Sequence, residues 1–115
     1  MKAPLSPRDK LWASGVYPLT KRYLNMFYIY ILQLKNNRLY IGFTSDLRNR
    51  YKQHQRGGVK STQKLLPLKL IHYECYLLEE DAKRREKFLK TSDGRFFLNR
   101  QISSYLRKIG RYKDI

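Results

Sequence analysis

The segment YIYILQLKNNRLYIGFT, residues 28–44, contains two short runs rich in aromatic and β-branched residues, separated by KNN. Such runs are typical of β-strands, and asparagine tolerates the left-handed backbone conformation that a tight loop requires. The segment therefore predicts a β-hairpin that begins near Met26. Its unusual feature is that each strand carries a polar aromatic residue, Tyr30 in the first and Tyr40 in the second.

The length of the loop determines whether these two tyrosines are neighbours, because successive side chains of a strand point to opposite faces of a sheet. A two-residue loop, NN, places Tyr30 and Tyr40 on opposite faces. A three-residue loop, KNN, pairs Leu32 with Tyr40 and places both tyrosines on one face. The alternation of side chains is compatible with either loop.

Residues 44–58, TSDLRNRYKQHQRGG, predict a helix after the hairpin. Thr44, Ser45 or Asp46 can cap its first turn, and Gly57 can end it in a left-handed conformation. Within this helix the apolar seam is formed by a leucine and a tyrosine four residues apart. An arginine and a histidine, also four apart, are expected along the edge of that seam.

Residues 68–77, LKLIHYECYL, predict a third strand with Ile71, Tyr73 and Cys75 on one face. Cys75 is the only cysteine, so an intrachain disulfide and a cysteine-rich zinc cluster are excluded. We expect it to be a small core residue.

Two more helices are predicted beyond this strand. Residues 78–90, LEEDAKRREKFLK, have an acidic first turn that suits the positive end of a helix dipole. The SDG of residues 92–94 is expected to end that helix, and residues 95–110 are expected to form a third. The resulting order, β-β-α-β-α-α, predicts an α+β fold with a three-stranded, mainly antiparallel sheet flanked by helices.

Composition bounds the organisation and the partner. Residues 1–25 contain three of the four prolines and no sustained period, so we expect a tail there, a domain over 26–110 and a short tail over 111–115. Packing of Trp12 and Tyr17 onto the domain is the alternative. Lys and Arg number 25 against 9 acidic residues, a net charge of +16 that favours nucleic acid as partner. No long apolar run predicts a membrane span or secretory signal, so a cytoplasmic or nucleoid-associated monomer is expected.

One carboxylate is expected in an unfavourable place. Ala82, Glu86 and Leu89 fall on one face of the second helix, so Glu86 lies in the stripe that should face the core. A buried carboxylate without a partner is costly, and it therefore requires a cation, either an arginine or a metal ion. Pairing with Arg85 or Lys90 at the boundary is the simpler explanation.

The chain resembles the GIY-YIG nuclease superfamily, in particular its small stand-alone bacterial members. The first family motif reads YIY at residues 28–30, with tyrosine in place of the usual glycine, and the second reads YIG at residues 40–42. The family's arginine matches Arg50, and its histidine or tyrosine matches His54. Its acidic residue matches Glu86, within DAKRREKFLK.

The resemblance implies a metal-dependent endonuclease that hydrolyses DNA phosphodiester bonds. Glu86 is expected to hold one ion, Mg²⁺ or Mn²⁺, and Arg50 to bind the scissile phosphate, with no small-molecule cofactor. Tyr30 is the first candidate for activating water, with Tyr40 orienting it, and His54 is the rival base. The joint spacing of the motifs requires both tyrosines on one face, near Arg50.

The remaining expectations concern contacts to the nucleic-acid backbone, Asn99, substrate selectivity and an alternative function. Contacts to the nucleic-acid backbone are expected from four cations, Arg48, Lys52, Lys60 and Lys64. Asn99 is the only counterpart of the asparagine that many family members carry, in a segment, GRFFLNRQI, unlike theirs. Selectivity for a DNA structure is expected, since no second domain reads sequence. The alternative function is a DNA- or RNA-binding module with the same fold and no turnover.

Overall fold

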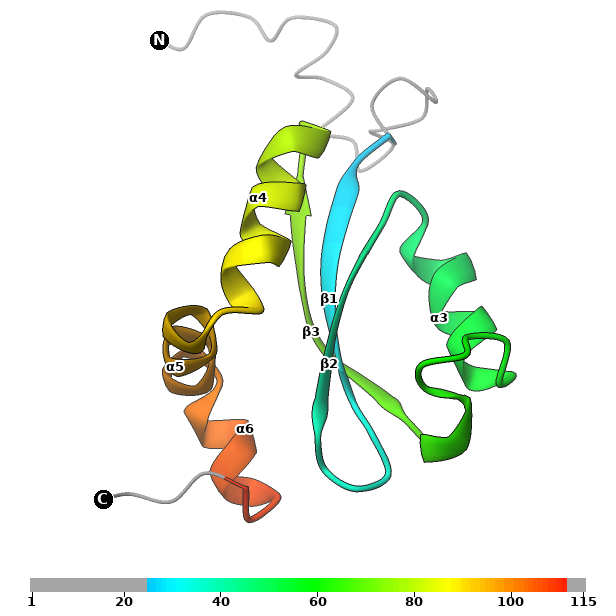
Figure 1. Ribbon diagram of the computed structural model, residues 1–115, viewed down its shortest axis with the longest axis vertical. Helices are drawn as coiled ribbons and strands as arrows, with labels where there is room; N and C mark the ends of the chain where they lie inside the picture. Colours follow the sequence, from blue (N-terminus) through cyan, green and yellow to red (C-terminus); the bar gives the residue numbers. More distant parts are fainter. Residues whose placement is uncertain (1–24, 112–115) are drawn as a thin grey trace, which may run out of the picture.

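A three-stranded antiparallel sheet forms the centre of the protein, as the computed structural model describes it for residues 25–111 (Figure 1). The strands are β1 (Phe27–Gln33), β2 (Leu39–Thr44) and β3 (Lys69–Tyr76), in the spatial order β2-β1-β3. Strand β1 pairs with both neighbours in antiparallel orientation. The predicted α+β fold is confirmed.

Helices cover both faces of this sheet. Helix α3 (Leu47–Gln55) and the short 3-10 turn η1 (Gln63–Leu65) lie on one side, and the remaining helices lie on the other (Figure 1). Those are α4 (Glu79–Leu89), α5 (Ser92–Gln101) and α6 (Ser103–Lys108). None of the helices over residues 25–111 is long and apolar enough to cross a membrane.

The expected tails fall mainly on residues 1–24 and 112–115, which lie outside the described part of the chain. The alternative in which Trp12 and Tyr17 pack onto the domain therefore stays a prediction.

The hairpin uses the three-residue loop. Leu32 pairs with Tyr40, and the amide of Leu34 donates to the carbonyl of Arg38 at 2.9 Å. Asn37 has a φ of 64°, the left-handed conformation for which asparagine is well suited. The predicted placement of Tyr30 and Tyr40 on one face is thus confirmed.

Alternation along β1 divides the core into two clusters. Ile29 and Ile31 face α4 and α5, where they pack with Ala82, Leu89 and Leu98. On the opposite face Tyr30 and Leu32 pack with the α3 seam of Leu47 and Tyr51. The sheet therefore has a purely aliphatic centre on one side and a tyrosine-containing centre on the other.

The capping predictions for α3 are confirmed at both ends. The Asp46 side chain accepts a hydrogen bond from the Asn49 amide at 3.1 Å, which makes Asp46 the N-cap. Gly57 has a φ of +77° immediately after the helix. This short, capped helix fixes the direction in which its side chains approach the sheet.

The prediction that SDG ends the second helix is wrong, because these residues form the first turn of α5. The Thr91 hydroxyl accepts a hydrogen bond from the Gly94 amide at 3.0 Å and so caps the new helix. A Cβ on Gly94 would overlap the Phe88 carbonyl, so this glycine serves a close approach between helices. The expected third helix is also divided at Ile102, where the backbone leaves the helical conformation.

Strand β3 does not show the predicted single apolar face. A register shift opposite Ile31 and Leu32 turns Ile71 toward the aliphatic cluster, whereas Tyr73 is 55% exposed. Cys75 is exposed, so its assignment to the core is wrong. The irregularity in pairing breaks the period of two on which the prediction depended.

Candidate active site

Tyr30 lies at the centre of a polar cluster between the sheet and α3. Its side chain is 1% exposed, and its hydroxyl lies 2.8 Å from Nε2 of His54. Nε of Arg50 donates to the same hydroxyl at 3.4 Å. Strand β1 and helix α3 thus bring together three of the residues singled out from the sequence.

Gly42 makes room for the Tyr30 ring. The two residues are directly paired across β1 and β2. A Cβ at Gly42 would lie 2.7 Å from Cε1 of Tyr30, closer than real side-chain carbons approach one another. The glycine of the YIG motif is therefore required to seat the buried tyrosine.

His54 is fully buried, which differs from the position at the edge of the helix seam that its spacing predicts. Thr62, a residue that the sequence analysis did not identify, holds the imidazole in this position. Its hydroxyl lies 2.8 Å from Nδ1 of His54, and its side chain is also fully buried. The loop after α3 folds back to deliver this hydroxyl. His54 is thereby hydrogen-bonded on both ring nitrogens.

The surrounding groups assign directions to these hydrogen bonds. The Val59 carbonyl can only accept, and it lies 3.5 Å from the Thr62 hydroxyl. We therefore assign the Thr62 hydroxyl as donor to that carbonyl and as acceptor from Nδ1–H of His54. Nε2 then accepts from the Tyr30 hydroxyl, whose oxygen in turn accepts from Arg50. The chain of bonds points the Tyr30 proton at His54.

Tyr40 completes the cluster from β2. Its ring centroid lies 6.2 Å from that of Tyr30 and 5.2 Å from that of His54. Unlike those two side chains, Tyr40 is half-buried and reaches solvent. Arg50 is also half-buried, and its Nη1 donates to Oε1 of Gln53 at 3.0 Å. The tyrosine and the arginine form the accessible rim over the buried pair.

Burial keeps the two central groups neutral. It raises the pKa of Tyr30 to about 12, even though the hydrogen bond from Arg50 acts in the opposite direction. Burial also lowers the pKa of His54 to about 4, and the positive charge of Arg50 contributes to that shift. At neutral pH the structure therefore holds a phenol beside an unprotonated imidazole.

Glu86 lies in α4, the helix that covers the other face of the sheet. Its side chain is 24% exposed, and its Oε2 accepts an ion pair from Nζ of Lys90 at 3.0 Å. The position at the margin of the core corresponds to the simpler of the two sequence explanations. Within the described residues, no three His, Cys, Asp or Glu side chains gather as a metal cluster.

Asn99 lies in α5 and lines a small cavity with Ile41 and Arg95. This cavity is on the side of the sheet that carries α4, whereas Arg50 and His54 come from α3. The structure therefore groups Tyr30, Tyr40, Arg50 and His54 in one cluster, and places Glu86 and Asn99 in the other helical layer.

The four cations expected to bind nucleic acid are all exposed on the α3 side of the chain. They are Arg48, Lys52, Lys60 and Lys64. Residues 45–68 contain six Lys or Arg and one acidic residue, whereas residues 79–90 contain five and four. Residues 91–111 add five Lys or Arg and one acidic residue, so the layer of α4 to α6 carries the same net charge, +5, as residues 45–68. The α3 side differs in that a single acidic residue stands among its cations.

A second polar cluster, which sequence reasoning missed, joins β3 to α4. Arg85 donates to both oxygens of Glu74, at 2.9 and 3.3 Å, and the Tyr76 hydroxyl donates to Oε1 at 2.7 Å. His72 lies 3.3 Å from Oε2. Although burial acts to raise it, these hydrogen bonds hold the pKa of Glu74 below its usual value. The alternation of His72, Glu74 and Tyr76 in β3 was the available sequence signal.

Comparison with known proteins finds a matching family model, several similar proteins and a similar solved structure. The model of the GIY-YIG catalytic domain matches residues 26–100. A UPF0213 protein of Clostridium perfringens is 39% identical over 66 residues, covering 56% of this chain and 71% of the relative. One from Haloquadratum walsbyi is 35% identical over 65 residues, covering 56% and 73%. A solution NMR structure of a UPF0213 protein from Bacillus halodurans is 32% identical, covering 64% of this chain and 81% of the other, with a TM-score of 0.43.

Proposed function

The chain belongs to the GIY-YIG family, and on that premise we propose that it is a metal-dependent endonuclease that hydrolyses phosphodiester bonds in DNA. The observation that carries the proposal is the neutral Tyr30–His54 pair, hydrogen-bonded at 2.8 Å, with a guanidinium beside it. Phosphodiester hydrolysis requires a proton acceptor next to a phosphate-binding cation, and this cluster supplies both.

Arg50 binds the scissile phosphate in this proposal. Its Nε and Nη1 already have partners in Tyr30 and Gln53, and these hold the planar fork in place. The donors that remain on the guanidinium suit the non-bridging oxygens of a phosphate. Four exposed cations on the α3 side support approach of the nucleic acid from that direction; they are Arg48, Lys52, Lys60 and Lys64.

Proton transfer then runs inward through the cluster. A water that attacks phosphorus gives its proton to the Tyr30 oxygen, while the Tyr30 proton moves to Nε2 of His54. The new P–O bond displaces the alkoxide of the leaving strand, which takes a proton from solvent. Tyr40, at the accessible rim, orients the water. In this proposal Tyr30 and His54 act as one unit, with Tyr30 as the group that contacts the water and His54 as the final proton acceptor.

Substrate binding supports this transfer electrostatically. With a pKa of about 4, protonation of His54 at pH 7 costs about 4 kcal/mol, since each pKa unit corresponds to about 1.4 kcal/mol. The charge of Arg50 contributes to the low pKa. A bound phosphate offsets that charge and raises the pKa of His54, so the imidazole becomes a better acceptor when substrate is present.

The chemistry of Glu86 fits a divalent ion. Mg²⁺ is commonly held by one or two carboxylates together with water and substrate phosphate, so a single glutamate is a sufficient protein ligand. The ion pair joins Lys90, whose side chain is half-exposed, to a carboxylate that is 24% exposed, and a metal ion would have to displace this ammonium from Glu86. When bound, Mg²⁺ or Mn²⁺ would supply neutralisation of negative charge on a substrate phosphate. Because Glu86 lies in the helical layer opposite Arg50, the ion and the guanidinium would contact the substrate from different sides of the sheet.

The test is nicking of supercoiled plasmid with Mg²⁺, with Mn²⁺ and with EDTA, together with duplex, flap and single-stranded substrates. Glu86→Gln should reduce metal-dependent nicking to the EDTA background. DNA binding should persist, because the change leaves the basic surface intact. Glu80→Gln, an exposed glutamate on the same helix, is the matched control and should cleave normally.

Two outcomes contradict the proposal. Full nicking by Glu86→Gln would remove Glu86 as the metal ligand. The absence of metal-dependent nicking by the unaltered protein on every substrate, with DNA or RNA binding retained, would instead support a binding module without turnover.

A further inference from the structure

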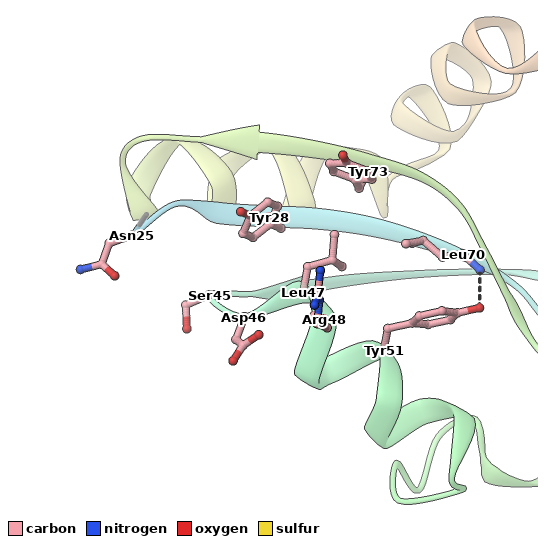
Figure 2. A pocket seen from close by; sticks show the side chains of 9 residues that line it. All are labelled: Asn25, Tyr28, Ser45, Asp46, Leu47, Arg48, Tyr51, Leu70 and Tyr73. Carbon is pink, nitrogen blue, oxygen red and sulfur yellow. Dashed lines mark hydrogen bonds between the residues drawn. The ribbon is translucent and has the colours of Figure 1, made fainter. Parts of the chain in front are cut away.

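A groove of about 610 Å³ opens between the N-terminal end of α3 and strands β1 and β3 (Figure 2). Its walls include the rings of Tyr28, Tyr51 and Tyr73 and the side chain of Leu47. None of Tyr30, Tyr40, Arg50 and His54 lines this groove, although Leu47 and Tyr51 pack against the same core cluster as Tyr30. Its volume lies in the range of small-ligand sites, so the chemistry of the lining side chains determines which ligand it can bind.

Two tyrosines, one half-buried and one exposed, form an aromatic floor. The rings of Tyr28 and Tyr73 lie 6.2 Å apart between centroids, with an angle of 59° between their planes. Tyr73 is 55% exposed. Tyr51 forms a fixed wall, because its hydroxyl accepts a hydrogen bond from the Leu70 amide at 3.3 Å (Figure 2). A flat, weakly polar ring could therefore enter between the exposed ring of Tyr73 and the hydrogen-bonded ring of Tyr51.

The rim of the groove is polar and cationic. Arg48 supplies a guanidinium, and Ser45 and Asp46 supply oxygen atoms at the start of α3. One carboxylate oxygen of Asp46 accepts from the Asn49 amide. The surrounding α3 segment is strongly basic. An aromatic floor with a mixed polar rim and a cationic surround is complementary to a nucleobase that carries its phosphate.

The position of the groove relates it to the candidate active site. Tyr51 reaches β3, whereas His54 contacts Tyr40 of β2, so the two sites flank α3 on opposite sides. Both begin from β1. Tyr28 and Tyr30 are next neighbours on one face of that strand, about 7 Å apart along it. A nucleic-acid strand that crosses the start of α3 would reach both sites within a few nucleotides.

We propose that this groove binds one unpaired nucleobase of the substrate, stacked on Tyr73 and in contact with Tyr28, next to the nucleotide whose phosphate Arg50 binds. The inference rests on the proposed function and narrows its substrate class to nucleic acid with an unpaired nucleotide, such as an end or a flap. A base inside a continuous duplex is covered on both faces by its neighbours, so it cannot occupy the groove without leaving the stack.

Binding in EDTA tests this independently of cleavage. A labelled single-stranded oligonucleotide and a blunt duplex of the same sequence are titrated by fluorescence anisotropy. Tyr73→Ala should weaken single-strand binding about 5- to 150-fold, the range expected for one lost base–aromatic stack, and leave duplex binding unchanged. Tyr73→Phe should retain the affinity, because the ring carries the interaction.

Two more variants control for bulk and location. Tyr73→Leu keeps apolar volume without an aromatic face and should behave as the alanine variant does. Phe96→Ala removes an equally exposed aromatic, at 55%, from the opposite helical layer and should have no effect. Quenching of 2-aminopurine in the oligonucleotide should fall with Tyr73→Leu and persist with Tyr73→Phe.

Wild-type single-strand affinity in Tyr73→Leu overturns the inference, as does an equal loss on both nucleic acids with an unchanged melting temperature. The proposed function fails separately. If the stacking results are as expected while no substrate is cleaved with metal, the proposal of a base-binding groove is supported and the proposal of endonuclease activity is refuted. If cleavage occurs and substitution of Tyr73 has no effect on single-strand binding, the proposal of endonuclease activity is supported and the proposal of a base-binding groove is refuted.

Discussion

The most specific test of the proton route is Thr62→Val, a change that removes one hydroxyl and preserves the shape of the side chain. Thr62 is fully buried, and its oxygen lies 2.8 Å from Nδ1 of His54. The substitution leaves a buried N–H of His54 without an acceptor, which typically costs about 1–3 kcal/mol. Around 2 kcal/mol would lower the melting temperature of a domain of this size by roughly 8–16 °C.

The effect on chemistry should exceed the effect on stability. Without the acceptor at Nδ1, the imidazole is free to carry its proton on Nε2, where it would face the Tyr30 hydroxyl as a second donor. We expect nicking to fall on the order of 10²-fold, the lower range for loss of general-base catalysis. The measurement is nicking at a temperature well below the new transition, with Thr62→Ser as the variant that restores both properties.

Nitrogen-15 NMR of the imidazole separates positioning from simple destabilisation. In the unaltered protein the spectrum should show a single tautomer protonated on Nδ1, and in Thr62→Val a mixture or the opposite tautomer. A variant with the native tautomer and normal nicking at a reduced melting temperature would refute the relay while leaving Thr62 a structural residue.

Three further predictions concern pH, packing and charge. His54 has a pKa of about 4 in the folded protein against an ordinary 6.5, so between these pH values the unfolded state binds one more proton than the folded state. The free energy of unfolding should therefore fall by up to about 3 kcal/mol as pH drops from 6.5 to 4. In urea titrations, His54→Gln should reduce this dependence of stability on pH. Gly42→Ala should destabilise the domain by about 1–3 kcal/mol in the same titrations, because its Cβ overlaps the Tyr30 ring; an unchanged midpoint would show that the ring can move. Lys60→Ala should weaken DNA binding equally across sequences and reduce the slope of log K against log salt by about 0.9; an unchanged slope would place Lys60 away from the backbone.

Local patterns in the sequence predicted the elements that depend on local chemistry. The strands of the hairpin and the Gly57 terminus follow from residue type and spacing, and the structure confirms both; of the three cap candidates, Thr44, Ser45 and Asp46, it selects Asp46. The shared face of Tyr30 and Tyr40 required a choice of loop length, which side-chain alternation alone did not supply. That choice came from the spacing of the motifs.

Features that depend on tertiary contact were not accessible in this way. Thr62 lies in an irregular loop with no period, so nothing in the sequence connects it with the imidazole of His54. The helix boundary at Thr91 was missed because Gly94 was interpreted as a chain break, whereas it permits close contact with the Phe88 carbonyl. The exposure of Cys75 follows from a register irregularity in β3 that composition does not encode.

The odd length of the hairpin loop makes the protein unequally tolerant of insertions and deletions. Adding or removing one residue among Lys35, Asn36 and Asn37 would carry every side chain of β2 to the opposite face, and Tyr40 would exchange places with Ile41. Point substitutions in the same loop change no facing. Libraries built for directed evolution should therefore recover substitutions at Lys35 and Asn36 more often than single-codon insertions or deletions, with Asn37 limited to residues that tolerate a left-handed backbone. Two-residue insertions should be recovered more often than one-residue insertions.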